Sequence, residues 1–257
     1  MTREVCSRRN AQLLVVALCA AAIKLHYSTA GADHLRWILA PTTFLVELAS
    51  GRRFEFEPHA GYINGERTFV IAAPCAGVNF LITSFLMLSL RRLWGDRAGG
   101  AGWKFIPLAA LCAYLTTLVA NSVRISTALQ TRALPLGPGW LGPDQLHRLE
   151  GIVIYFGFLL ILFVLGEKMG SESSSGKGSA STLFRRPFSP LLLYYATTLG
   201  IPVVNRAYRR GAEFWEHTLF VLLVPLLLIL PLAAFSFYRV QRLGRCGGDR
   251  SSCPQTM

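Results

Sequence analysis

Three side chains that could do chemistry together stand at the ends of different apolar runs in this 257-residue chain. They are the thiol of Cys75, the guanidinium of Arg124 and the imidazole of His147. A thiolate is a nucleophile, an imidazole can carry the proton that an acyl transfer moves, and a guanidinium can stabilise an oxyanion. The three residue types are therefore typical of cysteine-based acyl transfer.

Each of these residues also has an ordinary explanation when it is taken alone. Cys75 lies in Pro74-Cys75-Ala76-Gly77, which predicts the start of a helix, where a thiolate is stabilised, but it could equally be an interfacial cysteine without a task. Arg124 could be a snorkelling interface anchor, and His147 an ordinary interfacial histidine. Three such residues at one membrane level are harder to explain separately.

The remaining polar residues predict neither a metal nor a cofactor. His26, His34 and His59 lack the i, i+4 spacing of a helical zinc pair, and no CxxC is present. A membrane thiol oxidoreductase is disfavoured, because it would need a second outward cysteine to resolve the first. Glu150 could orient His147 or form a solvated i, i+3 pair, and Tyr155 is expected to serve packing.

The elements that must position these residues are membrane helices. Hydrophobic residues make up 52% of the chain and charged residues 16%, against roughly 25% charged residues in average soluble proteins. A spanning helix needs about 20 mostly apolar residues. We therefore expect an all-α, polytopic transmembrane helical bundle of about six spans, at 11–27, 76–90, 105–120, 151–166, 189–205 and 214–238.

Two segments between the first two spans have a different pattern. Residues 35–50 are apolar but short, carry Glu47 and are interrupted by Pro41, which predicts an interfacial or re-entrant helix at the outer surface. In residues 51–72 aromatic and acidic residues alternate and Asn64-Gly65 signals a turn. We expect a short β-like outer loop there.

The charges indicate the orientation of the spans and the partners. The net charge is +12, but Lys and Arg gather at the ends of apolar runs, as they do in cytoplasmic loops, so the expected partner is the lipid bilayer and no nucleic acid. With the N-terminus inside, Cys75, Arg124 and His147 fall at the outer ends of three spans. This orientation places Arg206, Arg209 and Arg210 outside, where the positive-inside pattern does not expect them. Residues 1–32 could alternatively contain a cleaved signal, with Ala30-Gly31-Ala32 as its site.

The chain divides by composition into four parts. Residues 1–169 are expected to form a membrane catalytic core, 170–188 a basic Gly/Ser-rich linker, 189–238 a C-terminal two-helix membrane segment, and 239–257 a basic cytoplasmic tail.

Three short motifs, in order, resemble those of the exosortase/archaeosortase family. They are Pro74-Cys75-Ala76-Gly77, Asn121-Ser122-Val123-Arg124-Ile125, and His147 followed by Glu150-Gly151. The resemblance covers roughly residues 60–166 and looks closest to the exosortase K-like branch. Ala76 stands where many members carry Ser, which is a small side chain in both cases.

The resemblance implies a membrane-embedded cysteine transpeptidase or peptidase in the bacterial cytoplasmic (inner) membrane, with its active site facing outside. It implies catalytic roles for Cys75, Arg124 and His147 and a supporting role for Asn121. The implied partners are exported proteins with a C-terminal sorting tail: a short signature, a membrane helix and a basic end. The acceptor is water or an amine. The alternative is a non-enzymatic membrane protein, either a transporter subunit or an assembly scaffold.

Overall fold

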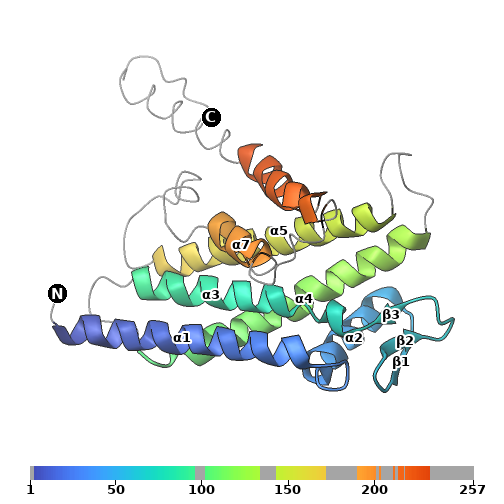
Figure 1. The fold of residues 1–257 in the computed structure, drawn as a ribbon, viewed down its shortest axis with the longest axis horizontal. Helices are drawn as coiled ribbons and strands as arrows, with labels where there is room; N and C mark the ends of the chain where they lie inside the picture. The colour runs from blue at the N-terminus through green and yellow to red at the C-terminus, as the bar shows by residue number, and fades with distance from the viewer. Residues whose placement is uncertain are drawn as a thin grey trace, which may run out of the picture. The chain divides into compact units, whose positions relative to one another are not determined.

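The computed structural model describes residues 3–95, 102–133, 143–171, 190–200, 203, 211, 214–216 and 218–231 (Figure 1). The chain divides into two compact units, residues 1–166 and 167–257. The described residues are predominantly helical, with one small sheet, so the prediction of an all-α chain is confirmed.

Most of the elements belong to the first unit. Its helices are α1 (Arg3–Thr29), α2 (Arg36–Ser50), α3 (Val78–Gly95), α4 (Phe105–Ala133) and α5 (Pro143–Ser171), the last of which runs past the boundary between the units. Between α2 and α3 lie β1 (Phe54–Glu57), β2 (Gly61–Asn64), β3 (Val70–Ile71) and the 3₁₀ turn η1 (Ala73–Ala76). The described part of the second unit contains α7 (Pro190–Thr198) and helical residues at 214–216 and 218–231.

Five helices in the described part of the chain are long and apolar enough to cross a membrane. They are Ser7–Thr29, Ala73–Trp94, Phe105–Thr131, Gln145–Gly166 and Phe214–Pro231. Their length and composition fit the hydrocarbon core of a bilayer, so the chain is a polytopic membrane protein with a helical bundle. Each of the five contains or overlaps one of the predicted spans.

The sixth predicted span, residues 189–205, is described only in part. Its described portion is the helix Pro190–Thr198, which is too short to cross a bilayer by itself. The predicted tail at 239–257, most of the predicted linker at 170–188, and the three arginines at 206, 209 and 210 lie outside the described residues. The sixth span and the orientation of this region stay predictions.

Helix α3 packs against both α1 and α4. Helix α3 buries apolar residues on more than one face, and one set of them recurs at three- and four-residue spacing. They join residues of α1, α2 and α4 in one core, whose α3 members are Val78, Leu81, Ile82, Phe85 and Leu93. This core holds α4, which carries Asn121 and Arg124, against α3.

Helix α2 continues through Pro41, which was expected to interrupt it. A proline has no N–H and leaves the carbonyl four residues earlier, that of Trp37, without its helical donor. The hydroxyl of Tyr114 on α4 donates to this Trp37 carbonyl at 2.7 Å, and the two rings stack with centroids 5.8 Å apart. Packing of α2 on α4 therefore compensates for the missing hydrogen bond.

The predicted β-like loop is an antiparallel sheet of order β1-β2-β3. Asn64 begins the turn, as expected, but the connection runs to Phe69 instead of closing after two residues. Its side chain holds this longer turn, because Asn64 Oδ1 accepts from the Phe69 N–H at 2.8 Å. Glu47 of α2 accepts from the Phe54 N–H at 2.7 Å and joins the sheet to the helix. The sheet thereby anchors the chain just before Cys75.

Candidate active site

Cys75 lies in the 3₁₀ turn η1, which is separate from the helix that follows it. The Cys75 N–H donates to the Ala72 carbonyl at 2.8 Å, and Gly77 then adopts a left-handed conformation with φ +70°. Helix α3 begins only after this glycine, whose carbonyl accepts from the N–H groups of Phe80 and Leu81 at 3.0 and 3.1 Å. Cys75 therefore lies at the start of the apolar span Ala73–Trp94, as predicted, but in a 3₁₀ turn that Gly77 separates from α3.

Gly77 also lets α4 and α5 approach this turn closely. A Cβ atom at Gly77 would lie 3.2 Å from Asn121 Cγ and 3.3 Å from the hydroxyl oxygen of Tyr155. Both distances are shorter than ordinary van der Waals contact. A side chain at position 77 would displace the two residues that connect Cys75 to the rest of the site.

Asn121 is fully buried and bonds in two directions. Its Nδ2 donates to the Cys75 carbonyl oxygen at 2.5 Å, and its Oδ1 accepts from the Tyr155 hydroxyl at 2.8 Å. The amide of Asn121 therefore joins η1 to α5 across α4. The supporting role that the resemblance implies for Asn121 stays a prediction.

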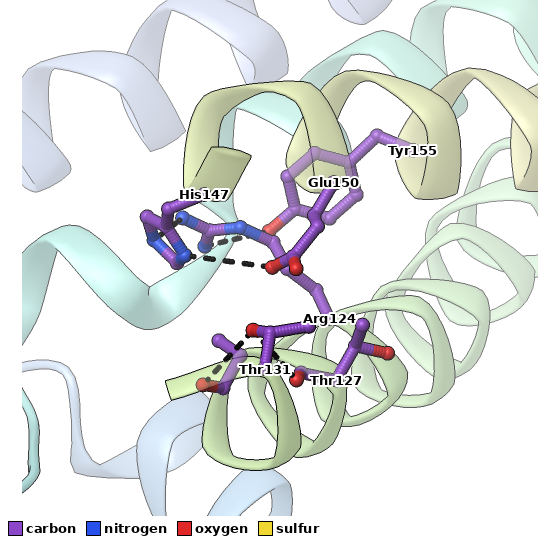
Figure 2. A network of polar contacts seen from close by, with 7 residues as sticks. Arg124, Thr127, Thr131, His147, Glu150 and Tyr155 are labelled. Carbon is purple, nitrogen blue, oxygen red and sulfur yellow. Dashed lines mark hydrogen bonds and ion pairs between the residues drawn. The ribbon is translucent and has the colours of Figure 1, made fainter. Parts of the chain in front are cut away.

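Arg124 lies well inside α4, which continues to Ala133. The expectation that it marks the end of this helix is wrong, because residues 126–133 remain helical. Its Nη2 lies 2.9 Å from His147 Nε2, and its Nη1 lies 3.5 Å from the Tyr155 hydroxyl (Figure 2). The guanidinium also lies over the Tyr155 ring, 5.5 Å from the centroid. Arg124 thus contacts two residues of α5 at once.

His147 belongs to the first turns of α5, since that helix begins at Pro143 rather than after the histidine. Its Nδ1 lies 4.0 Å from Glu150 Oε2 (Figure 2). The Glu150 side chain is only 10% exposed, whereas that of His147 is 38% exposed. The imidazole is therefore flanked by a cation on one ring nitrogen and by a largely buried carboxylate on the other.

Tyr155 is the site residue whose role the sequence analysis missed. It was expected to serve packing, and its ring does stack on Phe80 with centroids 4.9 Å apart. Its hydroxyl, however, connects Asn121 to Arg124. The signal was present in the spacing, because His147, Gly151 and Tyr155 recur every fourth residue and so share one face of α5.

Helix α1 adds two further residues that the sequence analysis did not connect with the site. Tyr27 is half-buried and lies close enough to Cys75 and Arg124 to interact with both electrostatically. One turn earlier, Lys24 Nζ donates to Asn79 Oδ1 at 3.1 Å, at the start of α3. The end of α1 therefore forms one side of the Cys75 turn.

The structure brings the predicted residues together in two ways. Arg124 and His147 are in direct contact, while Cys75 joins them through its backbone carbonyl, by way of Asn121 and Tyr155. The residues considered for a metal are placed elsewhere: His59 Nδ1 lies 2.9 Å from Asp33. Within the described ranges no group of three or more His, Cys, Asp or Glu residues could hold a metal ion.

The described cysteines differ in their surroundings. Cys19, Cys75 and Cys112 are all free thiols; Cys19 and Cys75 are partly buried, and Cys112 is exposed on α4. Of these three, Cys75 is the one whose backbone is hydrogen-bonded to the polar network. Searches of family models, of curated proteins and of solved structures find no match to this chain.

Proposed function

We propose that this chain is a membrane-embedded cysteine transpeptidase or peptidase that processes exported proteins at their C-terminal sorting tails. The proposal joins the motif resemblance to the exosortase/archaeosortase family with one structural observation. That observation is the run of hydrogen bonds from the Cys75 carbonyl through Asn121 and Tyr155 to Arg124 and His147. The proposed location is a bacterial inner membrane, with the site facing outside.

The polar network supports a functional site more than it supports simple packing. Ionisable residues within membrane segments are costly, and those that persist usually line substrate or proton pathways. Here an arginine, a histidine and a glutamate from two helices meet beside a cysteine turn. A scaffold helix pair could be held together by far fewer charged groups.

The residues supply the parts that acyl transfer needs. The Cys75 thiol gives its proton to His147 Nε2, and the sulfur bonds to the carbonyl carbon of the scissile peptide. Arg124 stabilises the oxyanion that forms. As the C–N bond breaks, the amine leaves with the proton from His147, and a thioester on Cys75 remains. Water or an amine acceptor then attacks the thioester, gives up its proton through His147, and restores the thiol.

The exposed surface of α4 offers a binding site for the membrane helix of a sorting tail. An exposed aliphatic stripe runs along α4 at three- and four-residue spacing and reaches the residue next to Arg124; it consists of Leu108, Leu111, Leu115, Val119 and Val123. Such a stripe faces lipid and can also accept an apolar helix laterally. A tail bound there would bring the residues just outside its helix to the level of Arg124.

The test replaces Cys75 in the host that carries this protein. The C-terminal peptides of exported proteins are compared by mass spectrometry between cells with the wild-type chain, with Cys75→Ala and with Cys112→Ala. We expect processed C-termini to disappear in Cys75→Ala and to persist in Cys112→Ala, because the second variant also removes a membrane-helix thiol but leaves the network intact. Cys75→Ser should accumulate uncleaved substrate. Unchanged processing in Cys75→Ala would favour the non-enzymatic alternative.

The orientation of the site is tested separately with a membrane-impermeant thiol reagent on intact cells. Labelling of Cys75 from outside is expected. Labelling only after permeabilisation would place the thiol on the cytoplasmic side and would contradict the proposed access to exported substrates.

A further inference from the structure

The hydrogen-bond directions around His147 are fixed by the chemistry of Arg124. A guanidinium has only N–H donors and no acceptor. The 2.9 Å contact between Arg124 Nη2 and His147 Nε2 therefore requires Nε2 to accept, with the imidazole proton on Nδ1. That Nδ1 faces Glu150 Oε2 at 4.0 Å. The imidazole is thus neutral, and its lone pair is already engaged.

Glu150 favours this tautomer. Its side chain is nine-tenths buried, and within the described residues neither carboxylate oxygen has a hydrogen-bond partner. A buried carboxylate is stabilised by a nearby N–H and destabilised by a lone pair pointing at it. In the Nδ1–H form of His147 this N–H lies 4.0 Å from Glu150 Oε2, which is too far for a hydrogen bond but close enough for an electrostatic attraction (Figure 2).

We propose that in the site without substrate Arg124 and Glu150 hold His147 in the form whose Nε2 lone pair accepts from Arg124; we call this the closed site. A substrate carbonyl opens the site by drawing Arg124 away from Nε2. This inference rests on the proposed function and adds its regulation. In the resting state the base cannot take the Cys75 proton, because its lone pair accepts from Arg124. When the guanidinium turns to the carbonyl oxygen of a bound substrate, Nε2 becomes available to take the thiol proton, and the thiol is deprotonated only in the presence of substrate.

The second anchor of Arg124 fits such a movement. The contact of Nη1 with the Tyr155 hydroxyl is 3.5 Å long, which is at the weak end for a hydrogen bond. The neighbouring α5 backbone is a glycine, Gly151, where a Cβ would lie 3.2 Å from Arg124 Nε. The guanidinium can therefore leave His147 without breaking a short hydrogen bond to Tyr155.

The closed site predicts that removing Arg124 makes the Cys75 thiol more reactive, not less. If Arg124 directly stabilised the thiolate, its removal would slow alkylation of Cys75. In the closed site, removal of Arg124 frees His147 and so accelerates alkylation. Among the described residues, the titratable groups that interact with Cys75, Arg124 or His147 include Tyr27, Glu150 and Tyr155, and all three stay in place in this comparison.

The experiment measures iodoacetamide alkylation against pH in the full chain, purified in lipid nanodiscs, with Cys75 as the sole cysteine. A cysteine with an unoccupied neighbouring base is largely thiolate at pH 7, whereas an ordinary thiol is a few per cent ionised. We expect Arg124→Met to raise the rate at pH 7 by about tenfold or more, and His147→Gln added to it to abolish the increase. A slower or unchanged rate in Arg124→Met would overturn the closed site.

A second measurement uses the wild-type protein and so does not depend on how the variants fold. The ¹⁵N chemical shifts of the His147 ring, assigned with His147→Gln, are expected to report an Nδ1–H imidazole at pH 7.5. An Nε2–H imidazole or an imidazolium would overturn the proposal. Neither measurement uses a substrate, so the outcome is independent of whether Cys75→Ala abolishes processing.

Discussion

Two pairs of polar side chains on α4 are satisfied in different ways. Thr116 and Thr117 donate to the carbonyls of Cys112 and Ala113, one turn earlier in the same helix. Asn121 and Arg124, farther along α4, bond to residues of η1 and α5 instead. A polar group satisfied within its own helix says little about function. One that is satisfied only by other elements requires those elements to be in place, and this marks the site.

Among the substitutions that test this comparison, Arg124→Ala is expected to lower processing the most. Losing one oxyanion donor typically lowers the rate about 100–1000-fold, and that is the loss of processing we expect. Thr117→Ala, in the first half of the same helix, serves as the matched control and should retain processing. A full-rate Arg124→Ala enzyme would show that the two pairs of α4 side chains do not differ in function.

Gly77→Ala tests whether the close approach of η1 to Asn121 is required. The left-handed backbone and the contacts with Asn121 and Tyr155 should together destabilise the fold by about 2–4 kcal/mol. The free energy of unfolding is measured by denaturant titration in mixed micelles. Gly31→Ala, whose Cβ would meet nothing within 4 Å, should be close to neutral. Equal stability of the two variants would contradict the packing described for η1.

Asn121→Leu removes the two hydrogen bonds that Asn121 makes to η1 and α5. It leaves the Cys75 carbonyl and the Tyr155 hydroxyl without their partner, which should reduce the free energy of unfolding by about 1–2 kcal/mol. Processing should fall as well, because η1 loses its anchor. Loss of stability with unchanged processing would make Asn121 a packing residue only.

Thr116→Val should have the smallest effect. The hydroxyl bonds only to a carbonyl of its own helix, and valine keeps the shape of the side chain, so the change in the free energy of unfolding should stay within about 0.5 kcal/mol. Processing should be unaffected. A large effect would show that Thr116 also matters beyond its own helix, and would remove the contrast with Asn121 and Arg124.

Several features of the site could be predicted from the sequence, and others could not. The types of Cys75, Arg124 and His147 and their nearness to ends of apolar runs pointed to one level of the membrane. Local rules failed where a contact from another helix decides the outcome. Pro41 lies within a continuous helix because Tyr114 bonds the Trp37 carbonyl, and no local pattern contains that information.

The sequence by itself determined that the chain is an apolar helical bundle, because hydrophobic content and run length alone decide whether a segment crosses a bilayer. It also determined which residue types could react. Only the tertiary structure decided that Tyr155 connects Asn121 to Arg124, that Gly77 separates Cys75 from α3, and that Arg124 and Glu150 flank His147. The reason is physical: these arrangements depend on the packing of α3, α4 and α5 to within a few tenths of an ångström, which helical periodicity does not specify.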